Sequence, residues 1–125
     1  MKKAFTMIEL VFVIVVIGIL SAIAIPKFAV TRNDAVESKA KSTVAAMRTA
    51  LAMERQKRIL QGDFDDINVS TVESLMEYGL DDRWTRDDAN NKFTFTSPTG
   101  ETCDFNITNN KLLKSDCDVD SLSDL

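Results

Sequence analysis

The sequence predicts an α+β protein in which one long N-terminal helix packs against a small antiparallel β-sheet. Two observations predict this class: an apolar run from Leu10 to Ile25 that continues into a helical repeat, and short alternating segments between residues 92 and 117. The 125 residues contain no histidine, which removes histidine-based triads and histidine-ligated metals. With no nucleophile–base pair or glycine-rich loop either, we expect neither enzyme activity nor a metal centre.

The first helix begins in a segment suited to a membrane. Only one glycine and one serine interrupt the apolar residues between Leu10 and Ile25. As a helix, residues 5–25 would span roughly 30 Å at about 1.5 Å per residue, which matches a hydrocarbon core. Lys2 and Lys3 precede the run, so the positive-inside rule places the N-terminus in the cytoplasm and the remainder outside.

Glu9 is the one charged residue of this segment. An ionised carboxylate within hydrocarbon costs roughly 3 kcal/mol unless it is paired, so Glu9 is a candidate functional residue. A cleavable secretory signal ending at Ala22-Ile23-Ala24 and a plain signal anchor are alternative interpretations, and both leave Glu9 unexplained. In a third alternative, Glu9 reaches the membrane interface near the start of the helix.

The string Lys3-Ala4-Phe5-Thr6-Met7-Ile8-Glu9-Leu10, followed by the apolar run and Pro26, resembles the class III signal of type IV pilins and pseudopilins. The resemblance implies that residues 1–4 are a leader peptide, which prepilin peptidase removes between Ala4 and Phe5. It also implies that Phe5 becomes N-methylated, and that Phe5 and Glu9 act in assembly. The family usually has glycine before the cut, where this chain has alanine.

The same resemblance assigns Gly18 and Pro26 to helix-loosening positions. Pro26 cannot donate a hydrogen bond to the carbonyl of Ala22, and glycine costs about 1 kcal/mol relative to alanine within a helix. An ordinary proline kink at the membrane edge is the alternative.

Removal of the leader creates a charge that complements Glu9. In a staggered array of parallel helices, the α-amine of Phe5 of an incoming subunit meets the Glu9 carboxylate of its neighbour, and each neutralises a charge that lipid penalises. Wrong registers leave both charges unpaired, so the pair selects the stagger more than it adds stability. Head-to-tail contacts of this kind do not close and therefore generate helical filaments.

The resemblance implies a structural subunit that assembles with itself, with other pilin-like subunits and with an inner-membrane assembly platform. We expect it to cross the lipid bilayer of a bacterial inner membrane once, with its head in the periplasm, and then to enter a periplasmic or surface filament. The short head favours a pseudopilus of a type II secretion or transformation system, serving protein secretion or DNA uptake. The alternative is a major or minor type IV pilin of a surface pilus, serving adhesion, motility or DNA binding.

Beyond the transmembrane residues 5–27, an amphipathic helix over 28–62 continues the first helix to about Leu60. Its apolar residues recur every three or four positions; they are Val36, Ala40, Val44, Met47 and Leu51. A basic stripe of Lys41, Arg48 and Arg55 recurs every seven residues. It is suited to lipid headgroups, to DNA (not favoured), or to acidic heads of other subunits.

Residues 63–125 form the predicted head, with fifteen acidic and five basic residues. A capping box from Ser70 to Glu73 predicts a short helix that Gly79 closes, and residues 81–91 read as a polar loop. Three strands follow, at 92–96, at 102–107 and from Leu112 onward. The side chains expected to face the helix are Phe93, Phe95, Phe105 and Ile107.

Cys103 and Cys117 are an even pair in a small exported domain, and a three-residue turn would place them opposite each other. We expect a disulfide, with two buried free thiols as the alternative.

Two further features of the head have simple interpretations. Asp116, Asp118 and Asp120 alternate like the start of a calcium loop, but the glycine and closing glutamate of an EF-hand are missing. A solvated tail is therefore favoured over calcium. Trp84 is expected to pack over the small core rather than to form an exposed contact.

Overall fold

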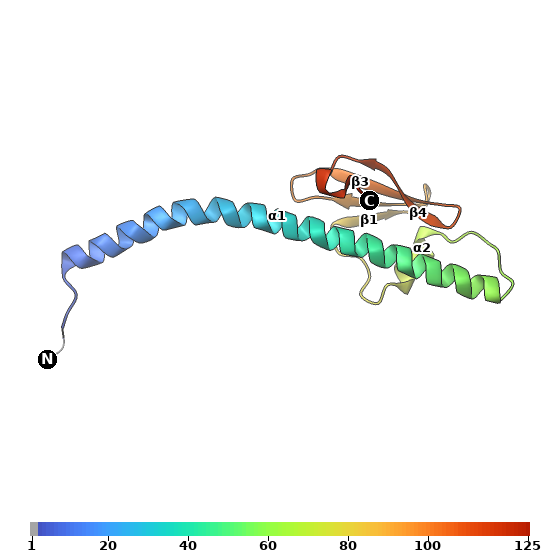
Figure 1. The fold of residues 1–125 in the computed structure, drawn as a ribbon, viewed down its shortest axis with the longest axis horizontal. Helices are drawn as coiled ribbons and strands as arrows, with labels where there is room; N and C mark the ends of the chain where they lie inside the picture. Colours follow the sequence, from blue (N-terminus) through green and yellow to red (C-terminus); the bar gives the residue numbers. More distant parts are fainter. Residues whose placement is uncertain (1–2) are drawn as a thin grey trace. The chain divides into compact units, whose positions relative to one another are not determined.

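The computed structural model describes residues 3–125, so Met1 and Lys2 of the expected leader lie outside the described residues. The chain divides into two compact units, one up to Asp34 and the other from Ala35 to Leu125. Helix α1 (Met7–Leu60) contributes to both units (Figure 1). The head predicted at 63–125 therefore shares a unit with the second part of α1, because the two have a common hydrophobic core.

The first unit consists of the apolar part of α1 and the few residues before it. An 18-residue window of this helix is apolar and long enough to cross a membrane, and none of it is buried. Gly18 and Pro26 both lie within the unbroken helix, so their helix-loosening role stays a prediction. The Ser21 hydroxyl donates to the carbonyl of Ile17 at 2.8 Å, which satisfies a polar group within an otherwise apolar surface.

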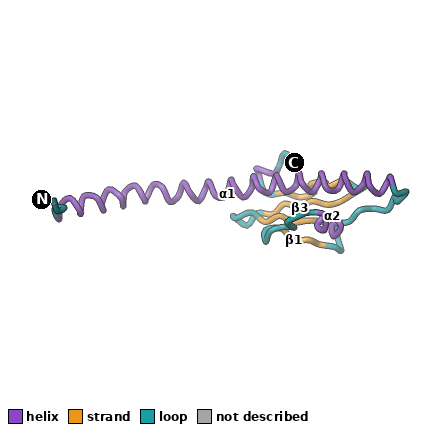
Figure 2. Tube along the Cα trace, turned by 90° about the horizontal axis from the view of Figure 1, so that it is seen from below, coloured by secondary structure: helices purple, strands orange, loops and turns teal. Residues whose placement is uncertain are grey.

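The second unit contains an antiparallel sheet in the order β1-β2-β3-β4. Its strands are β1 (Trp84–Asp87), β2 (Lys92–Thr96), β3 (Thr102–Thr108) and β4 (Lys111–Cys117). Figure 2 shows the sheet lying along the second part of α1. The predicted α+β class is confirmed, whereas the predicted number of three strands is wrong.

The additional strand is β1, which lies within the predicted polar loop 81–91. It pairs with β2 from Trp84↔Phe95 to Asp87↔Lys92. Only the first of its four residues is buried, so the strand presents no alternation of apolar and polar residues. As an edge strand, β1 needs only one hydrogen-bonded neighbour and tolerates a polar composition.

The β3–β4 register differs in detail from the prediction. The turn has two residues, since Thr108 pairs with Lys111, and both Asn109 and Asn110 have positive φ, at 52° and 57°. Asparagine tolerates this left-handed backbone, which two-residue hairpins require. A bulge at Ser115 then shifts the register by one, so Cys103 still lies opposite Cys117.

One face of the sheet and one face of α1 form the core. The four predicted helix-facing residues of β2 and β3 are all buried, as are four of the five predicted stripe residues of α1; Val36 is partly buried against them. The buried stripe residues are Ala40, Val44, Met47 and Leu51. Trp84 is 6% exposed and lies against Phe95 and Phe105, with ring centroids 5.2 and 5.8 Å apart. The expectation that Trp84 packs over the core is confirmed.

Helix α2 (Val69–Leu75) begins earlier than predicted, because its cap is Asn68 and not Ser70. The side-chain oxygen of Asn68 accepts a hydrogen bond from the backbone N–H of Thr71 at 3.3 Å. The predicted capping box is therefore wrong, and Glu73 instead forms an ion pair with Arg86 of β1. The helix ends at Leu75, and Gly79 lies in the following turn with φ of 65°.

Asparagine side chains hold the connection between α1 and α2 against the sheet. Asn110 Oδ1 accepts the backbone N–H of Ile67 at 2.7 Å, and Asn91 Oδ1 accepts that of Val69 at 2.9 Å. Asn91 Nδ2 also donates to the carbonyl of Ile107 at 3.1 Å. These bonds fix a segment that has little regular structure of its own.

Two ion pairs of the second unit favour ionised aspartates. Lys39 Nζ lies 2.9 Å from Asp81, and its hydrogen bond lowers the pKa of that carboxyl. Asp104 accepts hydrogen bonds from Lys92 Nζ at 2.8 Å and from the Thr94 hydroxyl at 2.6 Å. Both bonds lower the pKa of the Asp104 carboxyl, with Lys92 the larger cause.

We predict that Phe105→Ala lowers the free energy of unfolding by about 3–5 kcal/mol, because the substitution leaves a cavity in the core. Chemical denaturation of the full chain in detergent micelles measures the change. Leu113→Ala, at a half-exposed side chain of β4, is the control and should cost less than about 1 kcal/mol. Equal losses in the two variants would contradict the assigned core.

We also predict that Asp104→Asn destabilises the chain near pH 6 but has little effect at low pH. The folded-state pKa of Asp104 is lowered, so its ion pair adds stability above the ordinary aspartate pKa and loses it as pH falls through the lowered value. Unfolding curves between pH 2 and 7 measure the difference. Asp82→Asn is the control, since Asp82 is exposed and forms no ion pair within residues 3–125; a pH-independent effect of Asp104→Asn would refute the assignment.

Candidate functional site

The start of α1 is held by a side-chain cap. The Thr6 hydroxyl accepts the backbone N–H of Glu9 at 3.2 Å, while the Thr6 carbonyl accepts that of Leu10 at 3.1 Å. This arrangement satisfies an N–H group that has no partner within the helix. Thr6 was not predicted as a cap, although a threonine followed three residues later by glutamate is a recognised signal for a helix start.

Glu9 lies in the first turn of α1, exposed among apolar side chains. It borders a shallow hollow of about 380 Å³ whose other lining residues are Ile8, Val11, Phe12 and Val15. No lysine or arginine nitrogen of residues 3–125 lies within 4.0 Å of its carboxylate. The part of the chain described here therefore supplies no counter-charge to Glu9.

The predicted cleavage site lies just before this helix. Ala4 and Phe5 are exposed and precede the first helical residue, Met7. An exposed, non-helical peptide bond is the form in which a peptidase can bind its substrate. Phe5 thus lies four residues before Glu9 in the sequence, in the segment that precedes the helix, whereas Gly18 and Pro26 lie two or more turns beyond Glu9 along α1.

Gly18 faces open space on the helix surface. A Cβ atom built there meets no atom within 4 Å, so nothing within the described chain requires glycine at this position. A reason for the glycine must come from outside this copy of the chain or from the flexibility of the helix.

Cys103 and Cys117 are joined by a disulfide across the β3–β4 pair. No free cysteine remains in the described residues. The two cysteines are 14 positions apart in the sequence, so the bond links the start of β3 to the end of β4 and closes a loop that contains the β3–β4 turn.

The three aspartates considered for calcium do not gather into one site. Asp116 lies opposite Asp104 in the sheet, the backbone N–H of Asp118 donates to Thr102, and Asp120 begins the 3₁₀-helix η1 (Asp120–Leu122). Throughout residues 3–125, no three carboxylate, histidine or cysteine side chains are close enough together to hold a metal ion.

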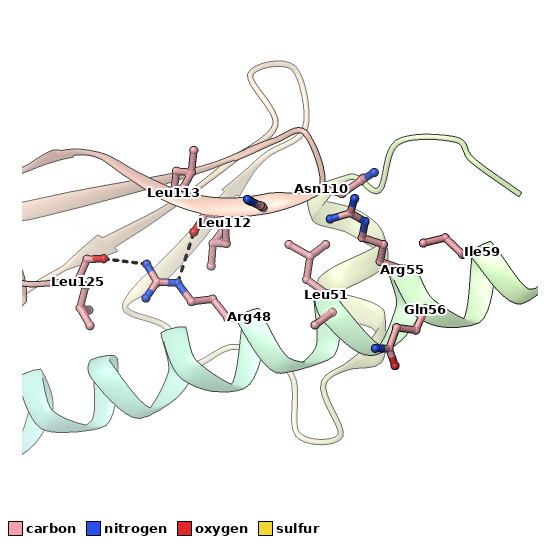
Figure 3. Close-up of a pocket in the computed structure, with 11 residues that line it drawn as sticks. Arg48, Leu51, Arg55, Gln56, Ile59, Asn110, Leu112, Leu113 and Leu125 are labelled. Atoms are coloured by element: carbon pink, nitrogen blue, oxygen red, sulfur yellow. Dashed lines mark hydrogen bonds between the residues drawn. The ribbon is translucent and has the colours of Figure 1, made fainter.

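The basic stripe is largely used within the chain. Lys41 lies 3.3 Å from Asp124, and Arg48 donates to the carbonyls of Leu125 at 2.9 Å and Leu112 at 3.4 Å (Figure 3). Arg55 forms no ion pair in the described structure. These contacts leave a weaker basic surface for DNA or lipid than the sequence spacing indicated.

A groove of about 650 Å³ lies between α1 and β4, as Figure 3 shows. Its apolar part includes Leu51, Ile59 and Leu113, and its charged lining residues are all basic, namely Arg48, Arg55 and Lys111. The lining residues of the groove include no nucleophile–base pair and no acidic side chain.

Comparison with known proteins identifies a family motif at the N-terminus and several relatives that each match up to half of the chain. Residues 1–25 match the prokaryotic N-terminal methylation motif. The chain is 49% identical over 51 residues to the major component of the narrow type IV pilus of Thermus thermophilus, which covers 41% of this chain and 44% of that protein. No solved structure gives a significant match.

Two other relatives are also pilus proteins. The type IV major pilin protein of Myxococcus xanthus is 46% identical over 49 residues, covering 39% of this chain and 22% of that protein. A fimbrial protein of Pseudomonas aeruginosa is 41% identical over 61 residues, covering 49% of this chain and 37% of that protein. The chain thus spans less than half the length of each of these relatives.

The family model covers Phe5 and Glu9, and the relatives named above are components of pili and fimbriae. The fold adds a long N-terminal helix packed against an antiparallel sheet. In its N-terminal methylation motif and in this architecture, the chain is similar to type IV pilins.

Proposed function

We propose that this chain is a structural subunit of a type IV pilus on the cell surface. One observation carries the proposal: an acidic side chain, Glu9, stands on an exposed apolar helix without a cation within 4.0 Å among residues 3–125. A charge so placed is costly in a bilayer, and the cost is removed when a second copy brings a cation to it.

Prepilin peptidase creates that cation, because its cut between Ala4 and Phe5 on the cytoplasmic side leaves a free α-amine on Phe5. The new α-amine of Phe5, which becomes methylated, precedes the Thr6 cap and projects from the start of the helix. In a staggered bundle this amine meets the Glu9 carboxylate of a neighbouring subunit, next to the apolar hollow that Phe12 and Val15 line. Both charges are then paired within the filament.

The apolar surface of the first unit serves two environments in turn. As a single helix it spans the bacterial inner membrane, with the disulfide-bonded head in the periplasm. After extraction by the inner-membrane assembly platform, the same side chains pack against those of other subunits. The exposed residues between Leu10 and Val30 would then be buried in the filament rather than in lipid.

A surface pilus is better supported than a pseudopilus. The short head favours a pseudopilin of a type II secretion or transformation system, but the relatives described above are a pilus major component, a major pilin and a fimbrial protein. Electron microscopy of intact cells distinguishes the two. Surface fibres that bind an antibody to the head, and that disappear on deletion of the gene, support a pilus; secretion lost without surface fibres supports a pseudopilus.

We predict that Glu9→Val leaves export and leader removal intact but prevents incorporation into filaments. The substitution removes the charge that selects the stagger and makes the helix more compatible with lipid. Filaments sheared from cells are quantified against the membrane-bound pool. Asp34→Val, which removes an exposed carboxylate of α1 beyond the apolar run, is the control and should assemble normally; normal assembly of Glu9→Val would refute the mechanism.

The mature protein is predicted to begin with methylated Phe5. Alanine before the cut leaves a small side chain for the peptidase, and Ala4→Gly should increase the processed fraction or leave it unchanged. Intact mass and N-terminal sequencing of the natural protein measure both. A chain that begins at Ile25 would instead identify a secreted domain released by a signal peptidase.

A further inference from the structure

The sequence contains two copies of the acceptor pattern for N-linked glycans, Asn-x-Ser/Thr. They are Asn68-Val69-Ser70 and Asn106-Ile107-Thr108. Each also has an aspartate two residues before the asparagine, Asp66 and Asp104. A short pattern of this kind becomes a site only where the asparagine is accessible.

The two asparagines differ in exposure and in the element that holds them, although Val69 and Ser70 of the first pattern belong to α2. Asn68 is exposed, in the connection that leads from α1 to α2. Its Oδ1 accepts hydrogen bonds from the Ser70 hydroxyl at 2.9 Å and from the Thr71 hydroxyl at 2.8 Å. Its Nδ2 makes no hydrogen bond within the described residues, so the nitrogen that would be glycosylated is available.

Asn106 lies within the central strand β3 and is only partly exposed. It is placed between Lys92 of β2 and Leu113 of β4, and its Oδ1 accepts the Ser115 hydroxyl at 3.3 Å. An acceptor peptide must leave the sheet to enter a transferase, which would break hydrogen bonds on both sides of the strand. This second pattern therefore serves as an internal control.

We propose that Asn68 is an N-glycosylation site, in which the side-chain nitrogen Nδ2 accepts the glycan. The donor is a glycan on a polyprenyl diphosphate carrier outside the cytoplasm, so the proposal rests on the head being exported as proposed above. The C1–Nδ2 bond forms, the C1–O bond to the diphosphate breaks, and the polyprenyl diphosphate leaves. One amide proton passes to a base of the transferase, and no oxidation state changes.

The modification is compatible with the fold. A glycan on Nδ2 leaves Oδ1 free to accept the backbone N–H of Thr71, so the cap of α2 is retained. The attached sugar extends from an exposed side chain into solvent, and the neighbouring core residues Ile67 and Val69 keep their burial.

Peptide mass spectrometry of the natural, full-length protein tests the site. Trypsin places Asn68 in the peptide 59–83 and Asn106 in the peptide 93–111. We expect peptide 59–83 to carry an added mass made of monosaccharide residues, located on Asn68 by fragmentation, and peptide 93–111 to be unmodified after reduction. A bare Asn68, or sugar on Asn106 with Asn68 bare, would overturn the proposal.

Matched variants separate loss of the acceptor from loss of the fold. Asn68→Asp keeps a good helix cap but lacks the amide nitrogen, and Ser70→Ala removes the hydroxyl of the pattern; both should lose the added mass completely. Ser70→Thr should keep it, and Asn106→Asp should leave it unchanged. Sugar that persists in Asn68→Asp would overturn the proposal.

The same sample reports export independently. A mature N-terminus at Phe5 and an intact Cys103–Cys117 disulfide show that the head left the cytoplasm, whatever the state of Asn68. A bare Asn68 in such a sample refutes glycosylation alone. A chain that retains residues 1–4 and free thiols refutes the proposed export as well.

Discussion

The unpaired carboxylate of Glu9 is the constraint on which the rest of this molecule depends. The helix around it is apolar and exposed, and the described chain offers no cation within 4.0 Å. A bilayer tolerates such a charge poorly, and a soluble protein would not keep so large an apolar surface in water. The proposed assembly solves both problems, because in a bundle of identical helices the Phe5 amine of one copy would neutralise Glu9 of the next.

The head has a hydrophobic core of its own, formed without residues of the apolar membrane segment. Its core joins one face of α1 to one face of the sheet, and the disulfide and the asparagine bonds of Asn91 and Asn110 fix segments that lack regular structure. Its acidic surface keeps the exported part soluble. In the proposed function, such a core would allow the subunit to wait in the membrane as a monomer before assembly.

Much of the fold followed from local patterns in the sequence. The helical repeat through Val44 and Met47 and the strict alternation in β2 and β3 predicted which faces are buried, since periodicity reports burial directly. Strand β1 was missed because only Trp84 of its residues is buried. Two details depend on three-dimensional contacts that composition does not encode. One is the use of Asn68, and not Ser70, as the cap of α2. The other is the bulge at Ser115, which compensates for the two-residue turn between β3 and β4.

The candidate site could be proposed from the sequence because Ala4, Phe5 and Glu9 are close together in the chain, whereas the proposed partner of Glu9 belongs to another copy and is not part of this structure. A side-chain resolution structure of the assembled filament therefore tests the central claim most directly. We predict that the α-nitrogen of Phe5 lies within about 4 Å of a Glu9 carboxylate oxygen of an adjacent subunit, as expected for an ion pair. Glu9 directed to solvent, or paired only within its own subunit, would contradict the account.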